Sequence, residues 1–373
     1  MSQLNEEAVK QALSRVIDPE LGRSITNLDM VREISIDAGG TVKVGVDLTI
    51  AGCPLQAVIE KDVKAEVSKV PGVSSVTVEM GVMDENQRAA LKEKLSGPQN
   101  VIPFTQPDNL TRIYAITSGK GGVGKSSMTA NLALSLAMQG LKVGVLDADI
   151  YGFSIPRMLG VSEEPTVIDG MIVPPVAGGV KVISIGMFVP DGQPVIWRGP
   201  MLHRALQQFL ADVYWGDLDV LLLDLPPGTG DVAISISQLL PKSEILVVTT
   251  PQVAAAEVAE RAGVIGSQTD QRVIGVIENM SYLPQADGSK LQLFGSGGGD
   301  MVSGRLSSEL GYQVPLLAQV PLDIALREGS DQGRPVVTTH PDSPASQAIS
   351  QVAQALAKRT QSLAGRSLGI KPL

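Results

Sequence analysis

The glycine-rich stretch that decides the fold of this 373-residue chain is Gly119-Lys120-Gly121-Gly122-Val123-Gly124-Lys125-Ser126. It fits the spacing GxxxxGK[ST]. An apolar run, IYAIT (113–117), precedes it directly, and a segment with helical spacing, 125–139, follows it directly. Glycines let backbone N–H groups close around phosphate oxygens, and the start of the helix adds its positive dipole end. The stretch therefore predicts a phosphate-binding loop between a strand and a helix.

The side chains at the end of this loop have distinct expected tasks. Lys125 should reach the β- and γ-phosphates of ATP, and the Ser126 hydroxyl should ligate Mg²⁺. The predicted nucleotide-binding set of the loop is Gly119, Lys120, Gly121, Gly122, Val123, Gly124, Lys125, Ser126 and Ser127. A glycine-rich turn that fits the spacing by chance is the alternative, and the flanking strand and helix argue against it.

The segments around the loop predict an α/β fold. Short apolar runs alternate with helical patterns, which is typical of a doubly wound, mostly parallel sheet covered on both faces. In the helical segment 125–139, Met128, Leu132 and Leu136 lie on one side, as in an amphipathic helix packed on a sheet. The predicted strands are RIYAIT (112–117), LKVGVLD (141–147), VKVISI (180–185), DVLLLD (219–224), EILVVTT (244–250) and RVIGVIEN (272–279).

Carboxylates at strand ends complete the predicted nucleotide site. Asp224 ends the run VLLLD, where it can hold the Mg²⁺ shell opposite Ser126. Asp147 and Asp149 follow the run VGVL, and a capping or turn role is the alternative for either aspartate. Gly228, in the loop PPGTGD, is expected to sense the γ-phosphate through its backbone, although a tight turn would also explain this composition.

The chain is expected to have two domains. Residues 1–95 combine helical segments with alternating strands and predict a small α+β domain. Residues 96–110 are rich in proline and polar side chains, as in a linker, and residues 111–373 form the expected P-loop domain. Near the C-terminus, 343–366 predicts a helix rich in Ala, Ser and Gln.

The composition excludes several classes of protein. A net charge of -9 disfavours binding to the phosphate backbone of nucleic acids, and an aromatic content of 3% offers few side chains for stacking on bases. We therefore expect no nucleic-acid partner. Uncharged stretches such as 126–141 are broken by polar residues, so we expect no membrane partner. The single cysteine, Cys53, cannot form an internal disulfide, which favours the reducing cytoplasm.

Several motifs together resemble the Mrp family of iron–sulfur cluster carrier ATPases. The N-terminal DPELG (18–22) and LTIAGCPL (48–55) are similar to the assembly-factor domain often fused to these ATPases. The ATPase likeness rests on KGGVGKS (120–126), DADIYG (147–152), WRGPM (197–201), WGDLDVLLLDLPPGTGD (215–231), ENM (278–280) and FGSGGG (294–299). The resemblance covers nearly the whole chain.

The resemblance implies roles for particular residues. Lys120 resembles the additional lysine of the deviant phosphate loop in the MinD/ParA class, which crosses to the nucleotide of a partner subunit, so a homodimer is implied. Asp149 is implied to position the attacking water. Asn279 is implied to contact adenine, with VPLD (320–323) closing the base pocket. A solvated surface lysine is the alternative for Lys120, and a turn residue is the alternative for Asn279.

The chain departs from the family at its cysteines. Many Mrp-type proteins have a CxxC pair after the ENM motif, and here that stretch, SYLPQADGSKLQLFG (281–295), has no cysteine. Cys53 is therefore the remaining candidate ligand for an iron–sulfur cluster, because it precedes a predicted helix whose dipole favours a thiolate. A small buried side chain is the alternative. Only His203 and His340 could add nitrogen ligands.

Three functions fit these observations. The resemblance favours a slow, Mg²⁺-dependent ATPase that delivers iron–sulfur clusters to apoproteins, with apoprotein clients and assembly factors as partners. A nucleotide-switched assembly chaperone without a cluster of its own is the second. The third is a membrane- or DNA-positioning ATPase, although the C-terminal helical segment lacks the Leu, Phe and Trp face that membrane insertion requires.

Overall fold

The computed structural model describes residues 4–53, 55–95, 101–150, 152–189, 199–252 and 271–359. The chain divides into two compact units. The larger unit comprises residues 100–165, 175–211 and 217–373, and the smaller one comprises residues 1–99, 166–174 and 212–216.

The larger unit is built on an eight-stranded sheet within the described residues. All neighbouring strands are parallel except the short edge strand β8, which runs antiparallel to β9. The spatial order is β15 (Leu316–Val320), β12 (Val273–Asn279), β11 (Glu244–Thr249), β4 (Arg112–Ser118), β10 (Val220–Asp224), β5 (Val143–Asp147), β9 (Val180–Ser184) and β8 (Val176–Ala177). The predicted α/β class and its six predicted strands are confirmed.

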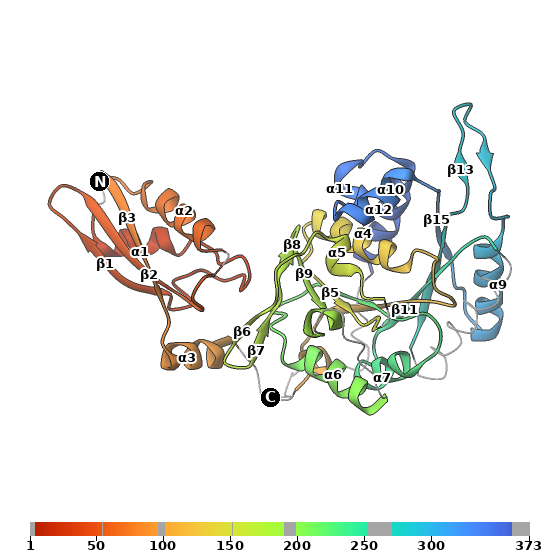
Figure 1. Ribbon diagram of the computed structural model, residues 1–373, viewed down its shortest axis with the longest axis horizontal. Helices are drawn as coiled ribbons and strands as arrows, with labels where there is room; N and C mark the ends of the chain where they lie inside the picture. Colours follow the sequence, from red (N-terminus) through yellow and green to blue (C-terminus); the bar gives the residue numbers. More distant parts are fainter. Residues whose placement is uncertain are drawn as a thin grey trace, which may run out of the picture. The chain divides into compact units, whose positions relative to one another are not determined.

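Helices cover both faces of this sheet (Figure 1). One group packs around α4 (Lys125–Met138) and contains α5 (Ile155–Met158), α10 (Ile324–Gln332), α11 (Val336–Thr339) and α12 (Pro344–Ala357). On the other face lie α6 (Gly199–Ala211) and α7 (Asp231–Leu239), which contact each other. α9 (Gly298–Leu310) packs against β12 and β15, and the hairpin of β13 (Leu283–Pro284) and β14 (Lys290–Leu291) precedes it.

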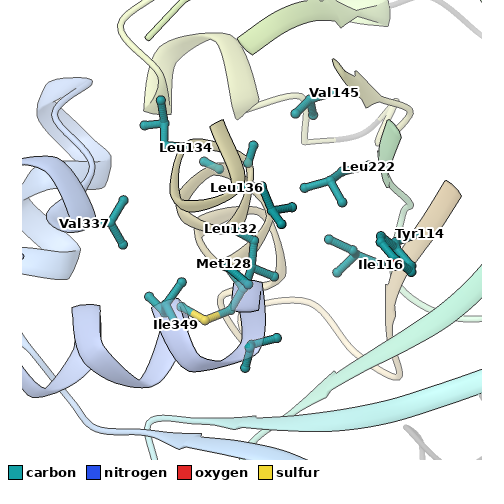
Figure 2. Close-up of a cluster of buried hydrophobic side chains, with 14 of the residues drawn as sticks. Tyr114, Ile116, Met128, Leu132, Leu134, Leu136, Val145, Leu222, Val337 and Ile349 are labelled. Carbon is teal, nitrogen blue, oxygen red and sulfur yellow. The ribbon is translucent and has the colours of Figure 1, made fainter. Parts of the chain in front are cut away.

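The helix after the glycine-rich loop lies at the centre of the core (Figure 2). Met128, Leu132 and Leu136 are fully buried, as their spacing predicts. The prediction of a one-sided amphipathic helix is wrong, however, because every residue from Met128 to Leu136 is buried. The physical reason is α12, which covers the side of α4 that faces away from the sheet and adds its own apolar side chains to the same cluster.

The smaller unit has a three-stranded sheet. β2 (Thr41–Leu48) pairs antiparallel with β1 (Val31–Ile36) and parallel with β3 (Ser75–Val82). α1 (Glu6–Leu13) and α2 (Gln56–Val67) pack with this sheet, and α3 (Glu85–Leu95) follows it. Sequence reasoning missed β1 and α3. In β1 the apolar alternation is limited to Ile34 and Ile36, which are only partly buried, and α3 buries only Leu91 and Leu95.

The smaller unit also contains two segments that we expected in the P-loop domain. They are the hairpin of β6 (Thr166–Ile168) and β7 (Met171–Val173), and residues 212–216. Ile168, Met171, Val173 and Tyr214 share one hydrophobic cluster with Leu91 and Leu95 of α3. Lys92 adds a hydrogen bond to the carbonyl of Asp169. Distant parts of the sequence thus build this core together.

Two predicted segments differ from their expected form. Residues 101–110 were expected to be tether, but Ile102 and Phe104 are buried around a short turn of helix (η1, Pro103–Thr105) that packs against α6. Residues 96–100 lie outside the described residues. The C-terminal helix is present as α12 but ends at Ala357, and residues 360–373 lie outside the described residues.

We expect the β6–β7 hairpin to contribute to the stability of the smaller unit. Met171→Ala should lower the free energy of unfolding by about 2 to 4 kcal/mol, because the side chain is 5% exposed and its removal leaves a cavity. Val167 lies on the same hairpin but is 55% exposed, so Val167→Ala should change stability by less than about 0.5 kcal/mol. Urea denaturation followed by circular dichroism measures both. Equal effects would contradict a shared core.

Candidate functional site

The order of the strands gathers the predicted site at one sheet edge. The glycine-rich loop connects β4 to α4, and β10 lies between β4 and β5 in the sheet. The register pairs Asp224, at the end of β10, with Ile116 of β4 and with Asp147 of β5. Because parallel strands end at the same edge, the loop and both carboxylates meet there.

A cavity of about 390 Å³ opens over this loop. Its volume lies within the range of small-molecule sites, which is roughly 300 to 1,000 Å³. A methyl group added at Gly121 or Gly122 would meet nothing within 4 Å, so the loop presents bare backbone to the cavity. The lining residues are Ser118, Lys120 to Ser127, Asp149, Gly152, Ser154, Met158 and Pro227. Gly119, Asp224, Gly228 and Asn279 are not part of this lining.

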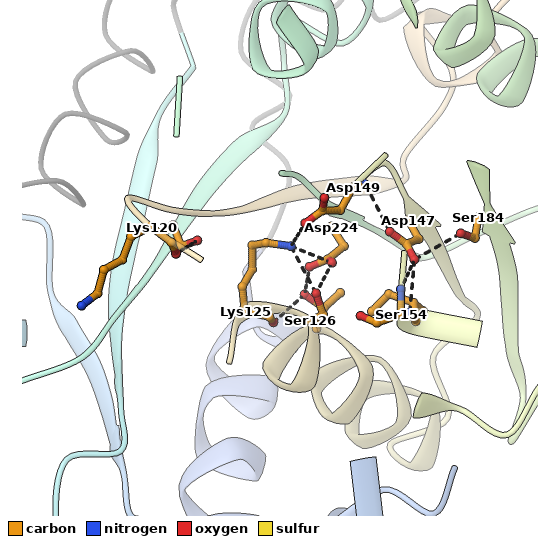
Figure 3. Close-up of polar contacts among 11 residues, drawn as sticks. Lys120, Lys125, Ser126, Asp147, Asp149, Ser154, Ser184 and Asp224 are labelled. Atoms are coloured by element: carbon orange, nitrogen blue, oxygen red, sulfur yellow. Dashed lines mark hydrogen bonds and ion pairs between the residues drawn. The ribbon is translucent and has the colours of Figure 1, made fainter. Parts of the chain in front are cut away.

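Lys125 lies in a buried cluster of charges (Figure 3). Its Nζ atom is 2.7 Å from Asp224 Oδ2 and 3.7 Å from Asp149 Oδ2, and the Lys125 side chain is only 6% exposed. Ser126 Oγ donates a hydrogen bond of 2.6 Å to the same oxygen of Asp224. The structure therefore brings together Lys125, Ser126 and Asp224, which were predicted to hold phosphate and Mg²⁺, and places Asp149, implied to position the attacking water, beside them.

Thr129 belongs to this cluster and was missed by sequence reasoning. Its Oγ1 donates a hydrogen bond of 2.7 Å to Asp224 Oδ1, so both carboxylate oxygens are held from α4. The available signal was its position, one helical turn after Lys125 and therefore on the same face of the helix.

Asp147 holds the loop that carries Asp149. Its Oδ2 accepts hydrogen bonds from Ser154 N (3.0 Å), Ile155 N (3.1 Å) and Ser184 Oγ (3.2 Å), and its Oδ1 accepts one from Asp149 N (3.2 Å). Burial, together with the Asp224 carboxylate, raises the pKa of Asp147 to about 7. Asp147 thus has the turn-forming role that was its alternative, while Asp149 reaches the cavity.

Two other predicted residues have contacts within the chain. Lys120 Nζ donates a hydrogen bond of 2.8 Å to Gln252 Oε1, just after β11, and Figure 3 shows the side chain pointing away from Lys125. The Gly228 amide donates to the carbonyl of Ser118 at 2.8 Å. In this conformation, neither group is directed at the Lys125 cluster.

Asn279 lies at the end of β12, behind the glycine-rich loop. Its Nδ2 donates a hydrogen bond of 2.9 Å to the carbonyl of Val123, and the residue is 3% exposed. Its Oδ1 is buried without a hydrogen-bond partner in the described part of the chain. In the predicted VPLD segment, Asp323 caps α10 by accepting a hydrogen bond from Ala325 N.

Cys53 lies in the smaller unit and is partly buried. Helix α2 has Leu55, not Cys53, at its N-cap. The expectation of a favoured thiolate is not met, because burial raises the pKa of the thiol and the carboxylates of Glu20 and Asp18 raise it further. Among the described residues, no three His, Cys, Asp or Glu side chains are grouped as metal ligands would be.

The donor set of the charge cluster fits Mg²⁺ and a nucleotide. Ser126 and Asp224 offer hard oxygen atoms, and Mg²⁺ in proteins is typically held by one or two carboxylates, waters and substrate phosphates rather than by a protein cage. Two carboxylates, Asp149 and Asp224, lie beside one lysine, Lys125, in this buried region. A divalent cation balances such an excess of negative charge.

No helix in the described ranges has the length and apolar character needed to cross a membrane.

Comparison with known proteins identifies the family of each part of the chain. Residues 109–357 match the family model described as NUBPL iron-transfer P-loop NTPase, and residues 6–80 match the model of an iron–sulfur cluster assembly protein. An iron–sulfur cluster carrier protein of Mycobacterium leprae is 58% identical over 98% of this chain and 96% of its own length. One of Bacillus subtilis is 41% identical over 86% of this chain and 88% of its own.

A solved structure supports the fold. The nucleotide-binding protein of Archaeoglobus fulgidus, in complex with ADP, is 35% identical and has a TM-score of 0.53, covering 63% of this chain and 93% of its own. The range of this chain that matches the P-loop model, residues 109–357, spans the glycine-rich loop and the carboxylates described above. The chain therefore belongs to the family of NUBPL iron-transfer P-loop NTPases, the iron–sulfur cluster carrier proteins.

Proposed function

We propose that this protein is a Mg²⁺-dependent ATPase that carries iron–sulfur clusters to apoproteins in the cytoplasm. The observation that carries the proposal is the meeting of Lys125, Ser126, Asp149 and Asp224 beside one cavity. The proposed cargo, an iron–sulfur cluster, is taken from the names of the relatives. Apoprotein clients and other iron–sulfur assembly factors are the partners that this function requires.

The proposed chemistry follows from the positions of the side chains. When bound, Mg²⁺ would neutralise phosphate charge, and Ser126 and Asp224 are the residues to hold it. Lys125 would leave Asp224 and bind the phosphates. Asp149 Oδ2, at the cavity, would accept a hydrogen bond from the attacking water and orient it towards the terminal phosphorus. We expect slow turnover, because a water is positioned well only after the site closes.

Closure is proposed to require a homodimer. Lys120 lines the cavity but has a hydrogen bond to Gln252 of its own chain. In the dimer Lys120 would leave Gln252 and bind the phosphates of the nucleotide in the partner subunit. Gly228 would likewise exchange the Ser118 carbonyl for the γ-phosphate.

This chain offers few ligands for an iron–sulfur cluster. Clusters normally take four thiolates, and a dimer of this chain supplies two, both from Cys53. A client cysteine or a small thiol such as glutathione would complete the shell, so cluster binding should be weak or client-dependent. The single cysteine also favours a second candidate function, a nucleotide-switched assembly chaperone without a cluster of its own.

The nucleotide chemistry is tested by two substitutions. Lys125→Ala should abolish ATP binding, because it removes the only cation in the cluster with Asp149 and Asp224 among the described residues. Asp149→Ala should bind ATP but hydrolyse it at least about tenfold more slowly, as is usual for loss of a positioned acid–base group. Calorimetry and phosphate release measure the two steps, with the exposed Lys142→Ala as control. Wild-type turnover by Asp149→Ala would contradict its assignment.

The dimer is tested at Lys120. Lys120→Ala should still bind ATP but lose ATP-dependent dimerisation and most of the hydrolysis, as measured by analytical ultracentrifugation with a non-hydrolysable analogue. Gln252→Ala is the matched control, since it frees Lys120 and should leave the dimer intact or strengthen it. A Lys120→Ala dimer as stable as that of the wild type would refute the contact with the partner.

The cargo is tested by anaerobic reconstitution with iron and sulfide. Cys53→Ser should lose the visible absorption and the bound iron while ATP hydrolysis is unchanged, because Cys53 belongs to the other compact unit. Iron bound by the wild type should rise when a cysteine-containing apoprotein is added. A full, stable cluster in Cys53→Ser would contradict the ligand assignment, and absence of any cluster or transfer in the wild type would favour the chaperone.

A further inference from the structure

We propose that Asn279 is a positioning residue of the nucleotide site, which fixes the peptide between Val123 and Gly124 so that the Gly124 amide faces the phosphates. This inference rests on the proposed nucleotide binding. It differs from a contact with adenine because it acts on the phosphate chain and not on the base.

The geometry of the peptide bond carries the first step. In a trans peptide the carbonyl of one residue and the N–H of the next point in opposite directions, and the unit is rigid and planar. Asn279 Nδ2 holds the Val123 carbonyl at 2.9 Å on the side of β12. The Gly124 N–H must therefore point away from β12. Val123 and Gly124 both line the cavity, so this direction is towards the space above the loop.

The contact is too close to be incidental. A Cβ atom at Gly124 would lie 2.3 Å from Asn279 Nδ2, and Gly124 has φ of +81°, so the side-chain amide occupies the place that a side chain at 124 would need. Gly124 is also the N-cap of α4 and has no side-chain hydrogen bond at that cap. Asn279 thus supports the loop from behind, at the point where the helix begins.

The neighbours of Asn279 keep it in place. Met280 has φ of +57°, which is uncommon for a residue with a side chain. Ser281 N donates to the carbonyl of Val320, and Ser281 Oγ donates to the carbonyl of Glu278. These bonds anchor the chain after β12 and hold the buried carboxamide against the loop.

Without the Asn279 Nδ2 donor, the Val123 carbonyl would lose its hydrogen bond, and the peptide between Val123 and Gly124 would be free to rotate. Asn279→Asp keeps the shape, but an ionised carboxylate only accepts hydrogen bonds, so it would repel the carbonyl. Asn279→Ala removes the donor without adding a charge. Asn131→Asp is the matched control, because Asn131 is 1% exposed and donates to the carbonyl of Ser127, whose peptide lies inside α4.

The test compares Mg²⁺-ATP with Mg²⁺-tripolyphosphate, which has no base. We expect both Asn279 variants to lose at least about tenfold in affinity for both probes. The reason is that the Gly124 N–H would no longer donate to a phosphate, and loss of a hydrogen bond to a charged group has an effect of this size. In the wild type, the amide proton resonance of Gly124 should move downfield when tripolyphosphate binds. In the variants this shift should be lost, while that of Gly122 persists. Asn131→Asp should behave like the wild type in both readouts.

The alternatives give different results. Loss of affinity for ATP alone would assign Asn279 to the adenine and overturn the positioning role. An unchanged Gly124 shift in Asn279→Ala would also overturn it, and that variant remains informative if Asn279→Asp does not fold. Failure of the wild type to bind either probe would instead refute the proposed nucleotide site itself.

Discussion

The ion pair between Lys125 and Asp224 links the first residue of α4 to the last residue of β10 inside the protein. Both side chains are nearly inaccessible to water, and a buried charge without a partner is strongly destabilising. Each residue therefore requires the other. Together with the parallel pairing of β10 and β4, the ion pair keeps the glycine-rich loop at the carboxyl edge of the sheet, where Asp147 and Asp149 also lie.

The same pair makes the site responsive to its ligand. Lys125 balances Asp224 in this conformation, so a nucleotide that draws the lysine away must bring a cation to replace it. The hydrogen bonds from Ser126 and Thr129 hold both oxygens of Asp224 in place during such an exchange. In the proposed mechanism, binding of phosphate and binding of Mg²⁺ are thereby coupled through one carboxylate.

Sequence patterns predicted the parts of this arrangement that are local. The glycine-rich loop, its strand and helix, and Asp224 at a strand end follow from spacing and apolar runs over a few residues. Thr129 was missed because its position one turn after Lys125 does not by itself identify its partner, Asp224, which is 95 residues away. The hydrogen bond from Asn279 to Val123 spans 156 residues and was missed for the same reason. The grouping of the β6–β7 hairpin with the smaller unit was not expected, because its core partners, Leu91 and Leu95, are far from it in sequence.

We propose that Lys125 exchanges Asp224 for phosphate when the nucleotide binds. A crystal structure of the Asp149→Ala protein with Mg²⁺-ATP tests it most directly, because slow hydrolysis should preserve the ligand. We expect Lys125 Nζ within hydrogen-bond distance of a β- or γ-phosphate oxygen, and Mg²⁺ bound by Ser126 Oγ on the side of Asp224. Lys125 still paired with Asp224, with the phosphates bound away from the glycine-rich loop, would contradict it.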